Sequence, residues 1–272
     1  MKLFDRWRSV RARILACVAG IAFSMLTGCA ECELDLAVSK QGAAVMTVQA
    51  VAAPEDLDRI KPLVPTLRAM GMDMSLTEAL LAARIPSKEI PPAAFENFAR
   101  MFGPKLQMDG VTRTSVGRKT GVRAVFRAAR VSDLYWSSSG QAGDRVGFHF
   151  VPGRAAIFRI LPPAAADAHP TSGQKDRGSI QALDKLLGAA LAPLRARVTV
   201  TVDGQILQTS AARKSGASSV VVAQADGRRM GLDTLMRMST VKSVGDIQAI
   251  AERPPAGVFL ENPVQPLVIR FE

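Results

Sequence analysis

The sequence predicts an α+β fold in which antiparallel β-hairpins, arranged as a meander, pack against several short helices. Segments such as 34–38 and 198–202 alternate apolar and polar residues with a period of two, which is typical of half-buried strands. Residues 54–102 show a helical spacing of apolar side chains that prolines interrupt. The composition, with 48% hydrophobic and 22% charged residues, is that of an ordinary globular protein.

The first 29 residues have the layout of a secretory signal peptide. A basic head with five Lys and Arg residues precedes an apolar run from Ile14 to Leu26, and Leu26-Thr27-Gly28-Cys29 closes the segment. As a helix, the apolar run from Ile14 to Leu26 would extend about 20 Å, which is shorter than the roughly 30 Å of a bilayer core. We therefore expect no permanent transmembrane span. The sequence therefore predicts a leader over 1–28 and a periplasm-facing domain over 29–272. An uncleaved leader or a plain secreted signal is the alternative.

The ending Leu26-Thr27-Gly28-Cys29 resembles the lipobox of bacterial lipoproteins, in which a Leu and two small residues precede an obligatory Cys. The resemblance implies cleavage between Gly28 and Cys29, a diacylglyceryl group on the Cys29 sulfur and an acylated amino terminus, with palmitate as a typical chain. About three chains anchor a protein durably, because each buried methylene contributes about 0.8 kcal/mol. Since Ala30 is not Asp, the enterobacterial sorting rule implies the outer membrane.

The charge balance of the mature chain is mildly basic. The leader holds five of the 35 basic and one of the 24 acidic residues, which leaves 30 and 23, a net charge of +7. Such a surface suits anionic lipid head groups, acidic envelope polymers or other envelope proteins. We expect no nucleic acid partner, because an exported chain does not meet one routinely. A solvated basic surface without a partner is the alternative.

The cysteines also agree with export. Cys17 leaves with the leader and Cys29 becomes a thioether, so Cys32 is the one remaining thiol. The spacing of Cys29 and Cys32 is that of a redox motif, but an acylated Cys29 forms no disulfide. We therefore expect Cys32 to be a buried or membrane-proximal thiol without chemistry.

The domain is expected to begin with a hairpin, strands 34–38 and 45–51 around Gln41-Gly42, and to continue with helices. Pro54 suits a first helical position, and Pro62 and Pro65 interrupt the helix because each removes a backbone donor. Residues 75–78, Ser-Leu-Thr-Glu, form a capping box for the next helix. A third segment follows Pro91-Pro92 and ends at Gly103-Pro104, with one buried face made by Phe95, Phe98 and Phe102.

Further strands are predicted over 105–116, 121–131, 146–150, 155–161, 198–202, 218–224 and 267–271, and further helices over 180–194, 232–238 and 243–251. The first four strands make the meander. Asp203-Gly204 predicts a type I′ hairpin turn leading to Ile206. The Pro-, Ala-, Gly- and Ser-rich loop 161–178 either divides the body into 29–160 and 179–272 or lies on the surface of one domain.

The residue types needed for catalysis or metal binding are sparse. His149 points away from its two Phe neighbours on a strand, and His169 lies in the loop, so neither suits a catalytic base. No zinc spacing or G-x-S-x-G motif is present, and residues 110–120 lack the spacing of a phosphate loop. Three methionines lie close together in the sequence, Met70, Met72 and Met74. Their thioethers would suit Cu(I), but no His or Cys lies nearby to complete a metal site, and methionines also suit an irregular core. We expect no enzyme, cofactor or metal site.

A basic run between Asp109 and Asp133 is the candidate for contact with an anionic surface. Its members are Arg113, Arg118, Lys119, Arg123 and Arg127, followed by Arg130. On a strand, Arg123 and Arg127 share one face while Ala124 and Phe126 point to the core. A solvated outer face is the alternative interpretation.

Three segments of the mature chain resemble the LppM-type lipoprotein domain and related uncharacterised envelope lipoproteins. They are Leu34-x-Leu36-x-Val38-x-x-x-Gly42, Gly121-Val122-Arg123-Ala124-Val125-Phe126 and Gly204-x-Ile206-x-x-Thr209-Ser210-Ala211, where relatives often carry Asn in place of Ser210. The resemblance implies a mixed α/β body with β-hairpins and a lipid-accommodating groove, and it carries over no catalytic residue. The sequence as a whole predicts a membrane-anchored envelope lipoprotein of the binding or scaffolding type. The alternative is a carrier that encloses a lipid or another hydrophobic ligand between sheet and helices.

Overall fold

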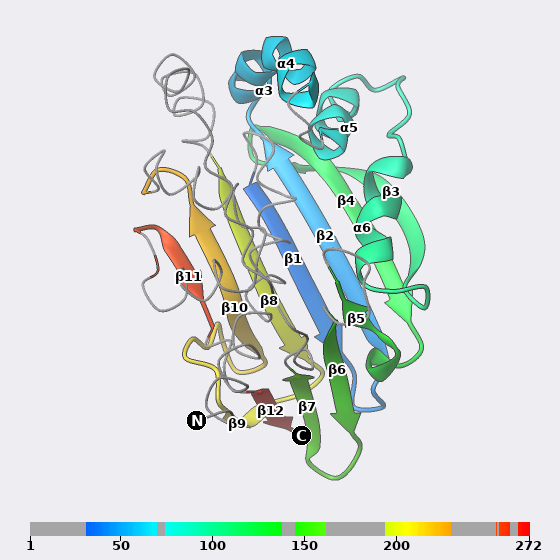
Figure 1. Ribbon diagram of the computed structural model, residues 1–272, viewed down its shortest axis with the longest axis vertical. Helices are drawn as coiled ribbons and strands as arrows, with labels where there is room; N and C mark the ends of the chain where they lie inside the picture. Colours follow the sequence, from blue (N-terminus) through cyan, green and yellow to red (C-terminus); the bar gives the residue numbers. More distant parts are fainter. Residues whose placement is uncertain are drawn as a thin grey trace, which may run out of the picture.

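The computed structural model describes residues 31–69, 74–137, 145–161, 194–229, 254, 256–261 and 266–272. In this part of the chain, twelve strands form two sheets that pack with short helices, which confirms the predicted α+β class (Figure 1). Several predictions fall outside the described residues: the leader, Cys29, the helices over 232–238 and 243–251, and, apart from one terminal residue each, the loop 161–178 and the helix 180–194.

The large sheet has seven strands in the order β11-β10-β8-β1-β2-β4-β3. Their bounds are β1 Glu31–Val38, β2 Ala44–Ala52, β3 Gln107–Val116, β4 Lys119–Ala128, β8 Arg195–Val202, β10 Ser219–Asp226 and β11 Val258–Leu260. Neighbouring strands are antiparallel except β1 and β8, which run parallel. The predicted alternation is confirmed on β1, where Leu34, Leu36 and Val38 are buried. A slip of one residue would expose this whole row, so burial fixes the register.

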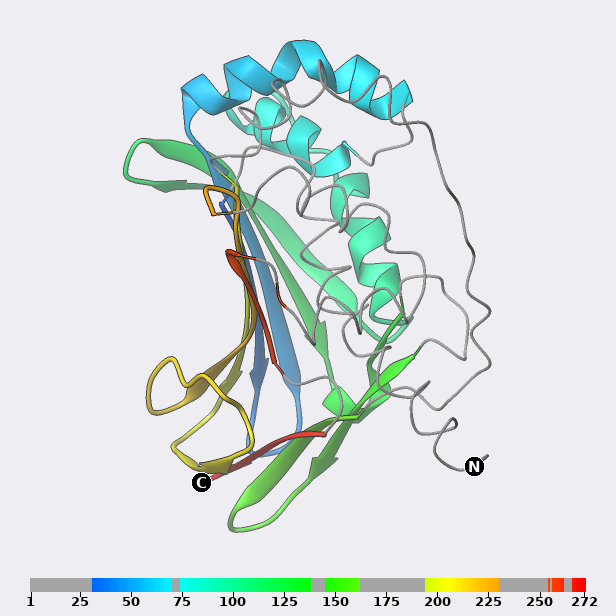
Figure 2. The ribbon, with the colours of Figure 1, turned by 60° about the vertical axis from the view of Figure 1, so that its left-hand side comes forward.

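The small sheet has five strands in the order β5-β6-β7-β12-β9 and crosses one end of the large sheet (Figure 2). Its strands are β5 Tyr135–Trp136, β6 Val146–Val151, β7 Ala156–Leu161, β9 Ile206–Thr209 and β12 Leu267–Phe271. The terminal strand β12 pairs with β7 and β9, as predicted for 267–271. The contact between the sheets is close at Gly42, whose φ is +82° and where an added Cβ would lie 2.6 Å from the Phe150 ring.

The helices cover the buried face of the large sheet beside β2, β4 and β3 (Figure 2). Their bounds are α3 Pro54–Ile60, α4 Val64–Ala69, α5 Ser75–Ala83 and α6 Ala93–Met101, with the 3-10 turn η1 Lys61–Leu63 between α3 and α4. The interruption expected from Pro62 and Pro65 is confirmed, because α3 ends at Ile60 and the chain passes through η1.

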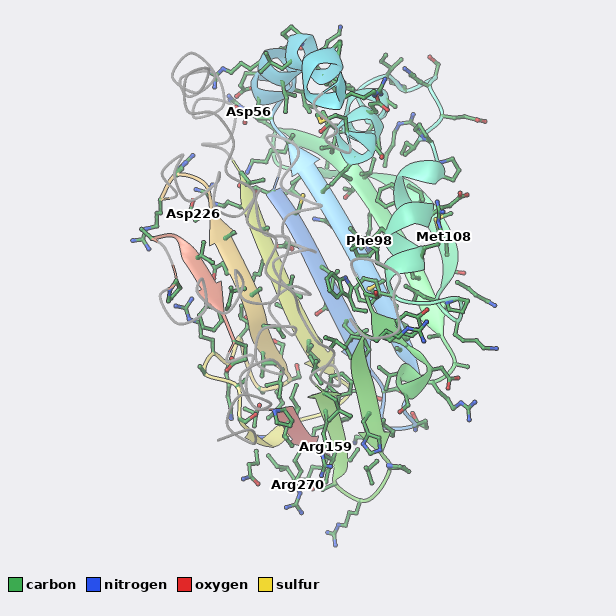
Figure 3. All side chains as sticks on the ribbon, viewed as in Figure 1. Asp56, Phe98, Met108, Arg159, Asp226 and Arg270 are labelled. Carbon is green, nitrogen blue, oxygen red and sulfur yellow. The ribbon has the colours of Figure 1, made fainter. Side chains whose placement is uncertain are left out.

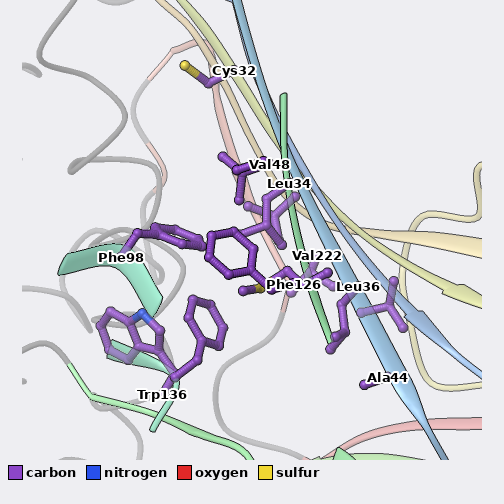
Figure 4. Close-up of a cluster of buried hydrophobic side chains, with 14 of the residues drawn as sticks. Cys32, Leu34, Leu36, Ala44, Val48, Phe98, Phe126, Trp136 and Val222 are labelled. Atoms are coloured by element: carbon purple, nitrogen blue, oxygen red, sulfur yellow. The ribbon is translucent and has the colours of Figure 1, made fainter. Parts of the chain in front are cut away.

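An aromatic cluster joins α6, the large sheet and the small sheet (Figure 4). The predicted face of Phe95, Phe98 and Phe102 is buried, and the Phe98 ring lies 5.9 Å from that of Phe126 between centroids. Trp136 on β5 is 1% exposed in the same core. One hydrophobic core therefore holds both sheets and the helices together.

The predicted meander is wrong in its connectivity. β3 and β4 form a hairpin in the large sheet, whereas β6 and β7 form a hairpin in the small sheet. The 3-10 turn η2, Val131–Asp133, connects β4 in the large sheet to β5 in the small sheet. It is held there because Val131 N–H donates to the Gly42 carbonyl, and Phe150 N–H donates to the Ser132 hydroxyl.

The predicted hairpin at Asp203-Gly204 is also wrong, because β8 and β9 belong to different sheets. A type I′ turn needs positive φ at both central residues, and among the described residues only glycines have positive φ. Asp203 N–H donates to the Val38 carbonyl, and Gln205 N–H donates to the Glu272 carbonyl. These long-range hydrogen bonds hold the segment that connects β8 in the large sheet to β9 in the small sheet. Gly204 is needed there because a Cβ would lie 2.1 Å from the Glu272 oxygen.

The predicted capping box at 75–78 is wrong in register. Ser75 is already inside α5, and the N-cap is Met74, which supplies no side-chain cap. Glu78 forms an ion pair with Arg68 at the end of α4 instead. This pair links α4 to α5 on the surface.

Replacing Phe126 by Ala should lower the free energy of unfolding by about 3–5 kcal/mol, because the ring is fully buried and its loss leaves a cavity. Chemical denaturation of the mature protein measures this change. Val116→Ala is the control, since that side chain is 50% exposed, and it should cost less than about 0.5 kcal/mol. Equal losses in the two variants would contradict the placement of Phe126.

Candidate functional site

The body of the protein begins almost directly at the predicted lipid-attachment residue. Cys29 lies outside the described residues, and β1 starts two positions later at Glu31. Glu31 is paired in register with Val51 on β2 and with Arg195 on β8. We call this end of the large sheet, where β1 begins, together with the turns that surround it, the Glu31 end.

The Glu31 end carries both paired and unpaired basic side chains. Lys119 Nζ lies 2.6 Å from Glu31 Oε2, and Arg195 lies 3.7 Å from Asp226. Arg118, in the turn between β3 and β4, and Arg228, just after β10, are exposed. Neither has a side-chain hydrogen bond or ion pair within the described part of the chain. Among the described residues, the Glu31 end therefore has positive charge that no acidic side chain neutralises.

The first turn of α3 lies at the same end. Burial raises the pKa of the Asp56 carboxyl, and the charges of Arg59, Lys119 and Arg228 oppose that rise. Lys119 and Arg228 therefore lie close enough to Asp56 to act on its charge, although they come from separate turns. Figure 3 shows Asp56 and Asp226 toward this end of the molecule.

The predicted basic run is not one continuous surface. Arg113 donates to the carbonyls of Ala83, Ile85 and Lys88, with distances of 3.4 and 3.0 Å for the first two, and so binds the chain after α5. Since cations stabilise helix C-termini, this contact is structural.

The remaining members of the run divide between two places. Arg118 and Lys119 lie at the Glu31 end, while Arg123 and Arg127 are exposed on the outer face of β4, as their spacing predicted. Arg127 Nε lies 2.8 Å from Asp109, and Arg130 Nε lies 3.1 Å from Asp133. Asp109 and Asp133, which flank the basic run in the sequence, thus neutralise part of its charge.

Three other singled-out residues have plain environments. Cys32 is 1% exposed in the core, which confirms the predicted burial of this thiol, and Met74 is also buried. His149 faces solvent on β6, as its alternation predicted. Met70, Met72 and His169 lie outside the described residues.

One basic pair was missed by the sequence interpretation. Arg159 on β7 and Arg270 on β12 share the outward face of the small sheet, since Val268 pairs with Arg159 and Arg270 pairs with Ile157. Each strand carries one outward Arg and no acid, which was the available signal. The pairing of the two strands could not be read from either segment alone.

The described residues contain no group of three or more His, Cys, Asp or Glu side chains that could hold a metal ion. Among the described helices, none has the length and apolar character needed to cross a membrane.

Comparison with known proteins gives one distant likeness. No model of a protein family matches the chain, and no curated protein matches it. Among solved structures, the chain is similar to the NMR structure of the folded domain of the Mycobacterium tuberculosis LppM protein, with a TM-score of 0.32, 10% identity and 90% of each chain covered. This neighbour is of the kind named by the sequence resemblance. The likeness is too weak to transfer a function.

Burial of the Cys32 thiol, together with the charge of Glu31, raises its pKa from 9.0 to about 12. Because the thiolate is the reactive form, Cys32 in the native mature protein should not react with a thiol reagent at pH 8 and should react fully in denaturant. Above pH 9 the unfolded thiol ionises while the folded thiol stays protonated, so stability should fall with rising pH. Cys32→Ala should lack this part of the decline. Rapid labelling of the native protein would show that Cys32 is accessible.

Proposed function

We propose that the chain is an envelope lipoprotein, held in a membrane by acylated Cys29, that acts by binding or scaffolding and not by catalysis. The observation that supports it is the position of Glu31 as the first residue of β1, a central strand of the large sheet. Only Ala30 separates the expected lipid from that strand. A tether this short holds the folded body against the bilayer.

This attachment orients the body. Strand β1 rises about 23 Å from Glu31 to Val38, and the small sheet lies at the Val38 end, where Asp203 N–H donates to the Val38 carbonyl. The Glu31 end therefore faces the membrane, and the small sheet projects away from it. Arg118 and Arg228 then lie where anionic lipid head groups are found, on the periplasmic side of what Ala30 indicates is the outer membrane.

A non-catalytic role is supported by how the described charged groups are used. Asp58 is held by Arg84 at 2.5 Å, and this contact lowers the pKa of Asp58. Asp35 accepts hydrogen bonds of 2.7 Å from Thr199 and Thr201. Such contacts serve the fold, and they do not assemble an acid, a base and a nucleophile.

A lipid carrier is the second candidate, and Trp136 favours it. Its indole Nε1 is buried without a hydrogen-bond acceptor among the described residues, close to Phe98 and Phe126 (Figure 4). A buried donor without an acceptor costs about 1–3 kcal/mol, which an ester carbonyl of an enclosed lipid would offset. Native mass spectrometry should then show a co-purified lipid that Trp136→Phe weakens, whereas a bare protein mass would exclude the carrier.

Fractionation of cells tests the anchor. The wild-type protein should be cleaved after Gly28 and remain in the membrane fraction after a high-salt wash. Cys29→Ser should not be cleaved after Gly28, so no processed, salt-resistant form of this variant should be found in the membrane fraction. Cys32→Ala is the matched control, because it removes the neighbouring cysteine and should behave as the wild type does. A Cys29→Ser protein that is still cleaved after Gly28 and stays bound would contradict the proposal.

Vesicle binding tests the orientation. In the unlipidated domain, residues 30–272 without the leader, Arg118→Gln with Arg228→Gln should weaken binding to phosphatidylglycerol vesicles at low salt by about 30-fold, from about 1 kcal/mol per basic residue. Arg123→Gln with Arg127→Gln removes the same charge from the outer sheet face and should have less than about a threefold effect. If the second pair has the larger effect, the sheet face and not the Glu31 end meets the membrane.

A further inference from the structure

The outward side of the small sheet is a basic surface without an acidic strand residue. His149 on β6 pairs in register with Arg159 on β7, and Arg270 on β12 pairs with Gln208 on β9. None of the five strands contains Asp or Glu. We call this surface, comprising His149, Arg159, Arg270, Gln208 and the aliphatic side chains between them, the arginine face.

The two arginines lie close together without compensation. They occupy diagonal positions on neighbouring strands, where Cα atoms are about 7–8 Å apart. Figure 3 shows Arg159 and Arg270 at the same end of the molecule. Within the described residues neither makes an ion pair or a side-chain hydrogen bond, and Arg159 Nε is buried without an acceptor. Two like charges at this spacing repel each other.

Three other described arginines on the surface have an acidic partner. Arg84, Arg127 and Arg130 each have a carboxylate within 3.1 Å. The carboxylate that follows β12 in sequence, Glu272, lies past the end of the strand, where its backbone is paired with Gln205. The arginine face is thus a concentration of positive charge that the rest of the described chain leaves uncompensated.

Apolar side chains are part of the same sheet. Val151 on β6 is 38% exposed and Leu207 on β9 is 44% exposed, and both are among the few large apolar side chains that the described residues expose. Ile157 and Val268 lie half-buried beside the arginines on the outward side. Arginine is enriched in protein–protein interfaces, and the buried centre of an interface is more apolar than the rest of the surface.

We propose that the arginine face docks an acidic, partly apolar segment of a partner protein. Carboxylates match the planar guanidinium fork, and apolar side chains of the segment cover Val151 and Leu207. A phosphate polymer or polysaccharide offers nothing to these aliphatic groups. The inference names a partner for the proposed binding role, and it does not depend on acylation of Cys29.

Binding to a soluble glutamate–tyrosine copolymer tests the inference with the purified full chain. The protein should bind this probe, and binding should weaken as salt rises. Arg159→Gln with Arg270→Gln should reduce affinity about tenfold or more, as loss of interface arginines does. Lys88→Gln with Lys105→Gln removes equal charge from exposed loops near α5 and α6 and should change affinity less than about twofold.

A second variant keeps both arginines. Gln208→Glu places a carboxylate opposite Arg270, so it should weaken copolymer binding while leaving or raising the unfolding midpoint. Absence of copolymer binding, or equal losses in the arginine and lysine pairs, would overturn the inference. Tighter binding of inorganic polyphosphate or of anionic vesicles to the same face would also overturn it, in favour of a phosphate ligand. None of these outcomes alters the fractionation result for Cys29.

Discussion

The pairing of β1 with its hairpin partner β2 on one side and with the distant strand β8 on the other is the constraint on which the rest of the structure depends. Antiparallel β2 lies on one side of β1, and parallel β8 lies on the other. One face of these strands is buried, so each pairing has a single register that keeps Leu34 and Leu36 in the core. Once β1 is fixed, its two ends acquire different surroundings, the turns at Glu31 and the small sheet at Val38.

The two ends differ in chemistry as well as position. At the Glu31 end, Lys119 and Arg195 have acidic partners, and Arg118 and Arg228 remain exposed in turns. At the other end, Arg159 and Arg270 lie on a sheet face with aliphatic neighbours and without acids. Separate charges in turns suit diffuse attraction to a membrane surface, whereas charges fixed side by side on a sheet suit a specific partner. The two proposals together describe a scaffold that is tethered at one end and recognises a partner at the other.

Local patterns in the sequence predicted most elements but not their partners. The period-2 alternation identified β1, β2, β4 and β8, since each buries one face, and the three phenylalanines identified the buried side of α6. The division into two sheets was missed, because alternation says which side of a strand is buried and not what lies beside it. At Asp203-Gly204 a strong local turn preference yielded to hydrogen bonds with Val38 and Glu272.

The candidate surfaces were predicted in part for the same reason. The basic run was visible as composition, but its neutralisation by Glu31, Asp109 and Asp133 depends on folding. Arg159 and Arg270 meet only because β7 pairs with β12, two segments far apart in the chain. Surface charge is thus readable from sequence, and its pairing is not.

The central claim is that an acylated Cys29 holds the Glu31 end of the large sheet against a membrane. Intact mass spectrometry of the protein extracted from membranes tests it most directly. The account predicts a chain that begins at residue 29 and is heavier than its amino acids by a diacylglyceryl group and an amide-linked acyl chain. A chain that begins at Met1, or one that carries an unmodified Cys29, would contradict it.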